Sequence, residues 1–455
     1  MFKYVLVCYA FLCPFVHPVV AQQLSIPGKQ VNPYNYQIKK SNIVSKAGVA
    51  SAHPLASKIG VAILKAGGNA FDAAIAMQFA LAVVYPGAGN LGGGGFMVAR
   101  KNSGQLLALD YREMAPAAAG RDMYLDSAGN AQTQLSQDGH LASGIPGTVA
   151  GLAETFKYAR LPWKYLVQPA IDLAAKGFVI TEAEAAGLNA NQEEFIQLNT
   201  VAPVFVKTGG WKAGDTLVQQ DLAITLSRIR DHGKNGFYTG ETARLVVEEM
   251  KRGGGIITLN DMAGYRAVWR KPITFPYKKK YTVITMPPPS SGGPLLTQMM
   301  QMLEPRQPGR LSYLSPAYVN LLVEAERRAY ADRAEHLGDA DFYPVPLNTL
   351  TSKAYAQQRM TNFVPGTAGK SSEVKAGVIK KESEETTHLS VYDAQGNMVA
   401  VTTTLNGGYG SRTVVGGAGF LLNNEMDDFS IKPGVPNMYG AVGGEANAIQ
   451  PGKRM

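Results

Sequence analysis

The sequence predicts an α+β protein, a globular chain that mixes helices with β-hairpins. Apolar residues recur at helical spacing over 53–66 and 70–84, whereas 388–404 alternates residue by residue on both sides of a turn. The 455 residues are 45% hydrophobic and 17% charged, which supplies enough apolar surface for a large core. No repeat of fixed period is present, so solenoid and propeller folds are excluded.

The N-terminal part of this pattern predicts two helices followed by a hairpin. Gly67-Gly68-Asn69 lies between 53–66 and 70–84 as a helix stop and a helix cap, so we expect an αα-hairpin. The second helix is apolar nearly all round, which predicts that it is buried between layers. Strands are expected at 96–100 and 105–110.

A mixed series of elements and one linker follow. Helical spacing is present at 148–159, 165–176, 242–252, 294–303 and 316–334, and strand patterns at 281–285, 388–392 and 398–404. Residues 366–385 have no sustained periodicity and are rich in Gly, Ser, Lys and Glu. This composition predicts an exposed linker that ends abruptly at Thr386.

Residues 1–21 have the order of a secretory signal peptide. Lys3 precedes an apolar stretch over 4–16, and small or medium residues follow at 19–21. We expect an exported protein, periplasmic or extracellular, without a membrane span after signal removal, since a span needs about 20 apolar residues. Cys8 and Cys13 are the two cysteines, so the mature protein is predicted to lack disulfides and cysteine-bound metal.

Charge and short motifs exclude several classes of partner. The net charge is +9, but the basic residues are scattered, so nucleic acid is not expected as a partner. Residues 87–92 match G-x-G-x-x-G, but a helix pattern precedes them and a strand pattern follows, the reverse of a dinucleotide site. No G-x-S-x-G elbow and no histidine pair at i, i+4 occur, and we expect neither a cofactor nor a metal.

Without a mature cysteine, a nucleophile would have to be a hydroxyl or another side chain. Thr386 is a candidate because it directly follows the charged linker. A chain cut before Thr386 would present an α-amine with a pKa of about 7.7–8.0, able to act as general base for the hydroxyl of the same residue. The pattern alone favours a loop that enters a hairpin, and His388 is then a hydrogen-bonded strand histidine.

Several sequence blocks together have the character of a family signature. Those near the C-terminus are Thr386-Thr387-His388-Leu389-Ser390-Val391, Thr404-Leu405-Asn406, the run 422–430, and Lys432-Pro433-Gly434-Val435-Pro436-Asn437. Further blocks are present at 92–97, 110–116, 147–151 and 287–293. In content and in order, these blocks resemble the γ-glutamyltranspeptidase family, also called glutathione hydrolases, and the resemblance covers essentially the whole mature chain.

This resemblance implies a fold and a domain organisation. Members have the four-layer αββα sandwich of N-terminal nucleophile hydrolases and are made as precursors that cut themselves, here between Glu385 and Thr386. Residues 22–385 would form the large-subunit region and 386–455 a small-subunit region, two chains of one precursor.

The resemblance also implies the reaction. Thr386 would attack the γ-carbonyl of glutathione or another γ-glutamyl compound, and water, an amino acid or a peptide would resolve the acyl-enzyme. Thr404 is similar to the threonine that orients the nucleophile. The acyl group is then transferred without a cofactor.

Substrate recognition is assigned by the same blocks. Arg112 is similar to the arginine that binds the α-carboxylate, for which a guanidinium offers two parallel donors. Asn406, Glu425 and Asp428 are similar to the residues around the α-ammonium. Tyr439 lies near the middle of 433–444, which resembles the lid of many bacterial members.

One departure from the family leaves alternatives open. Members continue past Lys453-Arg454 into a Pro-Leu-Ser-Ser-Met segment and a Gly-Gly pair, which supply further carboxylate ligands, the oxyanion hole and C-terminal strands, whereas this sequence ends at Met455. We expect a C-terminally truncated sequence of a γ-glutamyl-transferring hydrolase. The alternatives are a catalytically inactive product that retains at most γ-glutamyl binding, and a related acylase of β-lactam side chains.

Overall fold

The computed structural model describes residues 43–370, 374 and 386–455, so the predicted signal peptide, most of the predicted linker and Glu385 lie outside the described residues. The helices are α1 (Pro54–Lys65), α2 (Ala70–Val84), α3 (Thr133–Gln137), α4 (Thr148–Thr155), α5 (Trp163–Lys176), α6 (Glu182–Ala190), α7 (Gln192–Gln197), α8 (Gln220–His232), α9 (Asn235–Tyr238), α10 (Gly240–Gly253), α11 (Leu259–Gly264), α12 (Gly292–Leu303), α13 (Pro316–His336), α14 (Leu347–Leu350) and α15 (Lys353–Arg359). The strands are β1 (Gly48–Ala50), β2 (Gly94–Arg100), β3 (Leu106–Asp110), β4 (Phe178–Val179), β5 (Thr216–Leu217), β6 (Val268–Arg270), β7 (Ile273–Tyr277), β8 (Tyr281–Thr285), β9 (Thr386–Tyr392) and β10 (Met398–Thr404).

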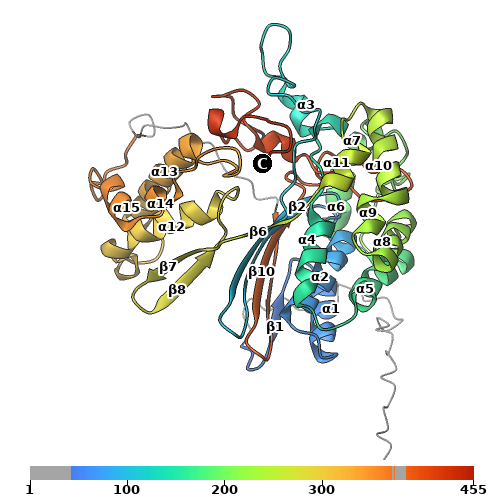
Figure 1. Cartoon of the computed structure of the whole chain (residues 1–455), viewed down its shortest axis with the longest axis horizontal. Helices are drawn as coiled ribbons and strands as arrows, with labels where there is room; N and C mark the ends of the chain where they lie inside the picture. Colours follow the sequence, from blue (N-terminus) through green and yellow to red (C-terminus); the bar gives the residue numbers. More distant parts are fainter. Residues whose placement is uncertain (1–42, 371–373, 375–385) are drawn as a thin grey trace, which may run out of the picture.

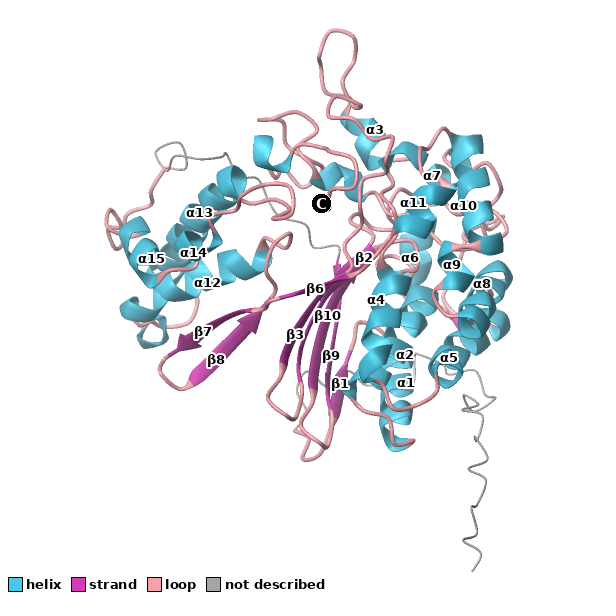
Figure 2. Cartoon of the chain, in the orientation of Figure 1, coloured by secondary structure: helices cyan, strands magenta, loops and turns pink. Residues whose placement is uncertain are grey.

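An antiparallel sheet of six strands lies at the centre of the molecule, in the order β1-β9-β10-β2-β3-β6 (Figure 2). The hairpin of β9 and β10 pairs with β2, although β2 is about 300 residues earlier in the chain. Thr404 at the end of β10 pairs with Thr386 on one side and with Gly94 on the other. This register aligns the start of β9 with the start of β2, with the end of β10 between them.

The helix α2 forms the centre of the core against one face of this sheet. All of its residues are buried, and it contacts β9, β10 and α5. Asn69 caps it by accepting from the amides of Phe71 and Asp72. The prediction of a buried second helix after a Gly-Gly-Asn cap is therefore confirmed.

A second group of elements lies on the other side of the sheet (Figure 1). It consists of the β7–β8 pair and α12 to α15, and it follows β6 directly in the chain. On the sheet face away from α2, the side chains of Tyr392 and Met398 are 41% and 47% exposed. The two sides of the sheet are thus covered unequally.

The expected helices and strands are present, with small shifts of their ends. The predicted helix 148–159 ends as an α-helix at Thr155 and continues as a 3-10 turn over Phe156–Tyr158. The α+β class is confirmed, and residues 87–92 form the connection between α2 and β2 rather than a strand-to-helix turn. Among the described residues, no helix has both the length and the apolarity that a membrane crossing requires.

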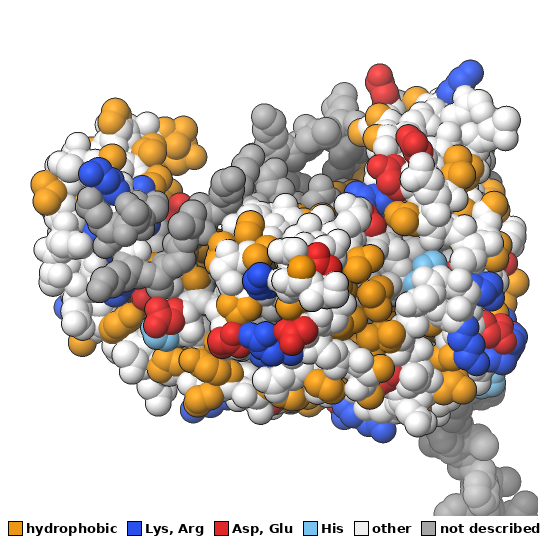
Figure 3. All heavy atoms as spheres, turned by 90° about the horizontal axis from the view of Figure 1, so that it is seen from above, with side chains coloured by type: hydrophobic (Ala, Val, Ile, Leu, Met, Phe, Trp, Pro, Cys, Tyr) orange, Lys and Arg blue, Asp and Glu red, His pale blue; other side chains and the backbone are white. Residues whose placement is uncertain are grey.

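The surface carries both signs of charge. On the face shown in Figure 3, Lys and Arg side chains are interspersed with Asp and Glu, as the scattered basic residues of the sequence suggested.

Asp72 is predicted to be one of the stability-determining polar residues. Its fully buried carboxylate accepts from the backbone amides of Asn69, Arg160 and Leu161 at 2.8–3.0 Å. An Asp72→Ala change leaves these donors without their acceptor and is expected to lower the free energy of unfolding by about 3 kcal/mol, measured by urea denaturation. Asp126→Ala, in an exposed turn, is the control and should cost about 1 kcal/mol or less. Equal losses in the two variants would contradict the assignment.

Candidate active site

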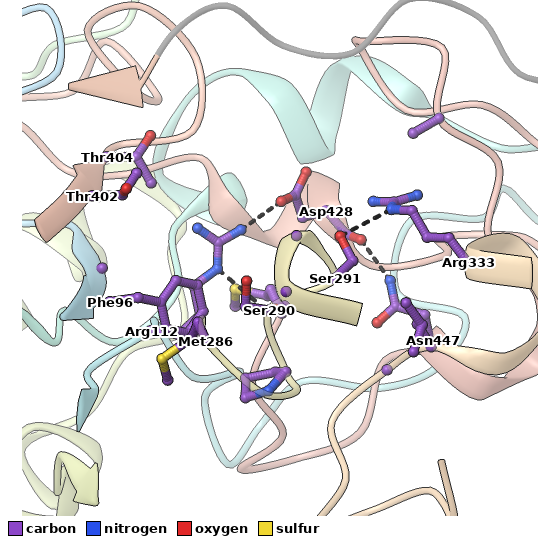
Figure 4. Close-up of a pocket in the computed structure, with 18 of the residues that line it drawn as sticks. Phe96, Arg112, Met286, Ser290, Ser291, Arg333, Thr402, Thr404, Asp428 and Asn447 are labelled. Carbon is purple, nitrogen blue, oxygen red and sulfur yellow. Dashed lines mark hydrogen bonds and ion pairs between the residues drawn. The ribbon is translucent and has the colours of Figure 1, made fainter. Parts of the chain in front are cut away.

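A cavity of about 560 Å³ opens between the sheet, the group of α12 and α13, and the C-terminal loops. Its sheet wall is formed by side chains of β2, β9 and β10, among them Phe96, His388 and Thr402. The opposite wall carries Ser290, Ser291 and Arg333 (Figure 4), and further lining residues come from the segment 428–447. Segments far apart in the sequence therefore meet here.

Arg112 projects into this cavity from the end of β3. Its guanidinium forms an ion pair of 2.5 Å with Asp428 and a second one with Glu425. Glu425 and Asp428 are the ends of one 3-10 turn, η7 (Glu425–Asp428). Arg112 and Asp428 are more than 300 positions apart in the sequence, and the fold brings them together (Figure 4).

Glu113 is a site-forming residue that the sequence assignment missed. It is fully buried, its carboxylate lies 4.0 Å from the Nε of Arg112, and neither oxygen has a hydrogen-bond partner in the described structure. Burial raises the pKa of Glu113, and burial together with the neighbouring carboxylates raises the pKa of Glu425. Three carboxyl groups thus surround one guanidinium. The only sequence signal was its position next to Arg112.

Thr404 lies at the end of the cavity where β10 stops. Its side-chain oxygen accepts from the amide of Asn406 at 2.8 Å, and its carbonyl accepts from the buried Asn90 at 2.8 Å. The glycine run permits this close approach, because a Cβ on Gly93 would lie 2.1 Å from the Thr404 carbonyl oxygen. Asn90 also accepts from Gly93 and Thr148, so it joins three segments behind the threonine.

The predicted site residues occupy two layers. Arg112, Thr404 and Asp428 line the cavity. Behind them lie Asn406, whose amide donates to the carbonyl of Asn424, and the buried Glu425.

Three further predicted positions remain, and the structure describes them to different extents. The backbone of Thr386 pairs opposite Thr404, and Glu385 lies outside the described residues. Tyr439 belongs to the loop over the cavity but does not line it, whereas its neighbour Asn437 does.

His388 is hydrogen-bonded, as expected for a strand histidine. Its ring nitrogens lie 3.0 Å from the hydroxyl of Thr402 and 3.1 Å from that of Ser390. Burial lowers its pKa. In the described part of the chain, no group of three His, Cys, Asp or Glu side chains is arranged to hold a metal ion.

Comparisons with known proteins agree with this arrangement. The chain is 49% identical over 411 residues to the glutathione hydrolase proenzyme of Escherichia coli, covering 89% of this chain and 70% of that protein. Its structure is similar to the crystal structure of Helicobacter pylori γ-glutamyltranspeptidase, with a TM-score of 0.71 and 43% identity over 76% of this chain and all of that chain. It also resembles cephalosporin acylase from Bacillus halodurans, with a TM-score of 0.77 and 27% identity over 94% of this chain and 76% of that one.

The fold and the comparisons define an enzyme of the mixed α+β class shared by γ-glutamyl hydrolases and acylases. The γ-glutamyltranspeptidase family model matches residues 56–455. The chain belongs to the γ-glutamyltranspeptidase family.

The buried carboxylates predict a pH-dependent stability. A carboxyl whose pKa is raised in the folded state keeps its proton at pH values where the same group in the unfolded chain has lost it. The free energy of unfolding therefore falls as the pH rises from the ordinary pKa of Glu through the raised pKa of the folded state. Each such proton contributes at most about 1.4 kcal/mol per pH unit.

The Glu113→Gln variant should show a shallower decline than the unchanged protein between about pH 5 and pH 8. Urea denaturation at a series of pH values measures this slope. Glu193→Gln, at an exposed position, is the control and should leave it unchanged. A slope in Glu113→Gln equal to that of the unchanged protein would contradict the inference.

Proposed function

We propose that this chain is an autoprocessing N-terminal threonine enzyme that cleaves γ-glutamyl bonds, with glutathione and its conjugates as substrates, and transfers the γ-glutamyl group to water, amino acids or peptides. The observation that carries the proposal is the pairing of Arg112 with Asp428 in a cavity that also contains Thr404. A guanidinium can pair with the carboxylate of an α-amino acid, and a carboxylate beside it can pair with the ammonium of the same amino acid.

In this proposal, Arg112 binds the α-carboxylate of the γ-glutamyl group. Asp428 accepts from the α-ammonium, and Asn406 and Glu425 support the same subsite from behind. The carboxyl group of Asp428 lines the cavity beside the guanidinium, where it can pair with a ligand ammonium.

The nucleophile is Thr386, released by cleavage of the bond between Glu385 and Thr386. Its α-amine acts as general base for its hydroxyl, and the resulting acyl-enzyme is resolved by water or an acceptor amine. Thr404 orients the nucleophile, since the two residues pair across neighbouring strands. The loop with Tyr439 covers the bound γ-glutamyl group.

The domain organisation follows from the same proposal. Residues 1–21 are a signal peptide that directs the protein to the periplasm or outside the cell, 22–385 form the large-subunit region, and 386–455 belong to the small-subunit region. The fold is a four-layer αββα sandwich. The six-stranded sheet is one inner layer, and the β7–β8 pair, which α12 contacts, belongs to the second.

Substrate selectivity tests the proposed amino-acid subsite. γ-Glutamyl-p-nitroanilide should be cleaved with a kcat/KM about 100-fold above that of glutaryl-p-nitroanilide, because the glutaryl group lacks the ammonium that the carboxylates require. Release of p-nitroaniline measures both rates. Equal rates would exclude the glutamate subsite and favour an acylase of non-amino-acid side chains.

Autoprocessing is tested by removing the hydroxyl of the proposed nucleophile. The Thr386→Ala variant should remain a single chain, whereas the unchanged protein should yield a second chain that begins with Thr386. Intact mass spectrometry measures both products. Thr361→Ala, at an exposed position, is the control and should be processed normally. Two chains from Thr386→Ala would refute the assignment.

A further inference from the structure

The segment 433–444, here called the flap, has an internal structure of its own. The side-chain oxygen of Asn437 accepts from the amides of Tyr439 and Ala441 at 3.1 and 2.9 Å. Pro436 and Val442 form an antiparallel bridge, and Gly440 adopts the positive φ of 75° that the turn between them needs. Because these contacts lie within the flap, the flap can keep its shape when its contacts to the rest of the protein change.

The base of the flap is held by contacts that do not involve its tip. The amide of Ser430 donates to the carbonyl of Asn447 at 2.9 Å. The ammonium of the buried Lys453 donates to the carbonyls of Ala446 and Ala448, each at 2.8 Å. A change at the tip therefore leaves the base in place.

The tip is attached through the two neighbouring carboxylates of η7. The amide of Met438 donates to Asp427 at 2.8 Å, and the side-chain amide of Asn437 donates to Asp428 at 3.2 Å. Asp427 is completely buried, and its other oxygen accepts from the hydroxyl of Ser136 on α3 at 2.6 Å. A continuous path of hydrogen bonds thus runs from Ser136 through Asp427 and the flap to Asp428.

Asp427 has no place in the binding scheme above. It does not line the cavity, and its two oxygens are occupied by Ser136 and Met438. Charge-assisted hydrogen bonds to a buried carboxylate are among the stronger ones in proteins, so these two contacts fix both the carboxylate and the flap tip.

We propose that Asp427 is a positioning residue that latches the flap over the cavity and, through Asn437, orients Asp428 toward the ammonium of the substrate. The identity of that substrate rests on the proposed function, whereas the latch is a property of the chain itself. Ser136 contributes by holding the Asp427 carboxylate in the orientation that receives the Met438 amide.

Hydrogen–deuterium exchange of the full-length protein tests the latch without substrate. In Asp427→Ala, peptides covering 433–444 should exchange about tenfold faster than in the unchanged protein, while peptides of α2 keep their rate. Asp427→Asn retains one acceptor oxygen and should restore part of the protection. Asp215→Ala is the matched control, because Asp215 also accepts a backbone amide, that of Lys212, but from a different loop.

Steady-state kinetics on γ-glutamyl-p-nitroanilide test the consequence for the site. Asp427→Ala is expected to raise KM about tenfold with a smaller change in kcat. The KM of Asp427→Asn should lie between those of Asp427→Ala and the unchanged protein, and Asp215→Ala should have the KM of the unchanged protein.

Two results would overturn the latch. In the first, peptides covering 433–444 exchange at the same rate in Asp427→Ala as in the unchanged protein. In the second, the exchange rate of α2 peptides rises as much as that of the flap peptides in both Asp427 variants. The unchanged protein could be inactive on γ-glutamyl amides while the flap still loses protection in Asp427→Ala. That combination would overturn the proposed function and retain the latch.

Discussion

The guanidinium of Arg112, largely shielded from water, is the constraint on which the rest of the site depends. A cation with little exposure to water needs acidic partners, and Arg112 receives them from Glu113 beside it and from Glu425 and Asp428 on η7. Removing one member of a buried pair typically costs about 3–5 kcal/mol, because the other charge stays behind uncompensated. The end of β3 and the turn η7 must therefore meet, and this fixes where the C-terminal segment lies.

A second constraint acts on the backbone. The glycines before and within β2 bring this segment within reach of the last carbonyls of β10, where a Cβ at Gly93 or Gly95 would overlap Thr404 or Thr402. Asn90 then joins the glycine run to Thr404 with its side-chain amide. The same close approach that completes the sheet thus sets the distance between the threonine end of the cavity and Arg112.

Local sequence patterns predicted the individual helices and strands better than the pairing between strands. The all-round apolar character of 70–84 and the alternation around 393–397 identified α2 and the β9–β10 hairpin, because each pattern reports one element's own burial. Helices α6 and α7 and the three-residue strand β1 were missed because short elements contain few turns or alternations from which to form a pattern. The longer helix α8 was missed as well. The pairing of β10 with β2 depends on residues about 300 positions apart, and no local pattern encodes it.

The site was predicted by motif, and a motif names residues without saying which way they face. Arg112, Thr404 and Asp428 line the cavity, whereas Asn406 and Glu425 lie behind it and their side chains contact other protein groups. Glu113 and Asp427 stood inside the matched blocks and were passed over, because their importance comes from burial, which only the packed chain determines. Neighbours of a motif arginine or aspartate are therefore worth testing even where the motif assigns them nothing.

The walls of the cavity differ in how firmly they are held, and this difference suits a site for a charged ligand. The sheet wall is fixed by strand pairing and by the core around α2, whereas the contacts of the flap tip to the rest of the protein include those with Asp427 and Asp428. A ligand with both a carboxylate and an ammonium must lose water to enter, and its interactions with Arg112 and the carboxylates strengthen once water is excluded. A firmly held sheet wall and a cover that can detach satisfy both requirements. The flap can open for exchange of the ligand, and its closure restores the contact of Asn437 with Asp428.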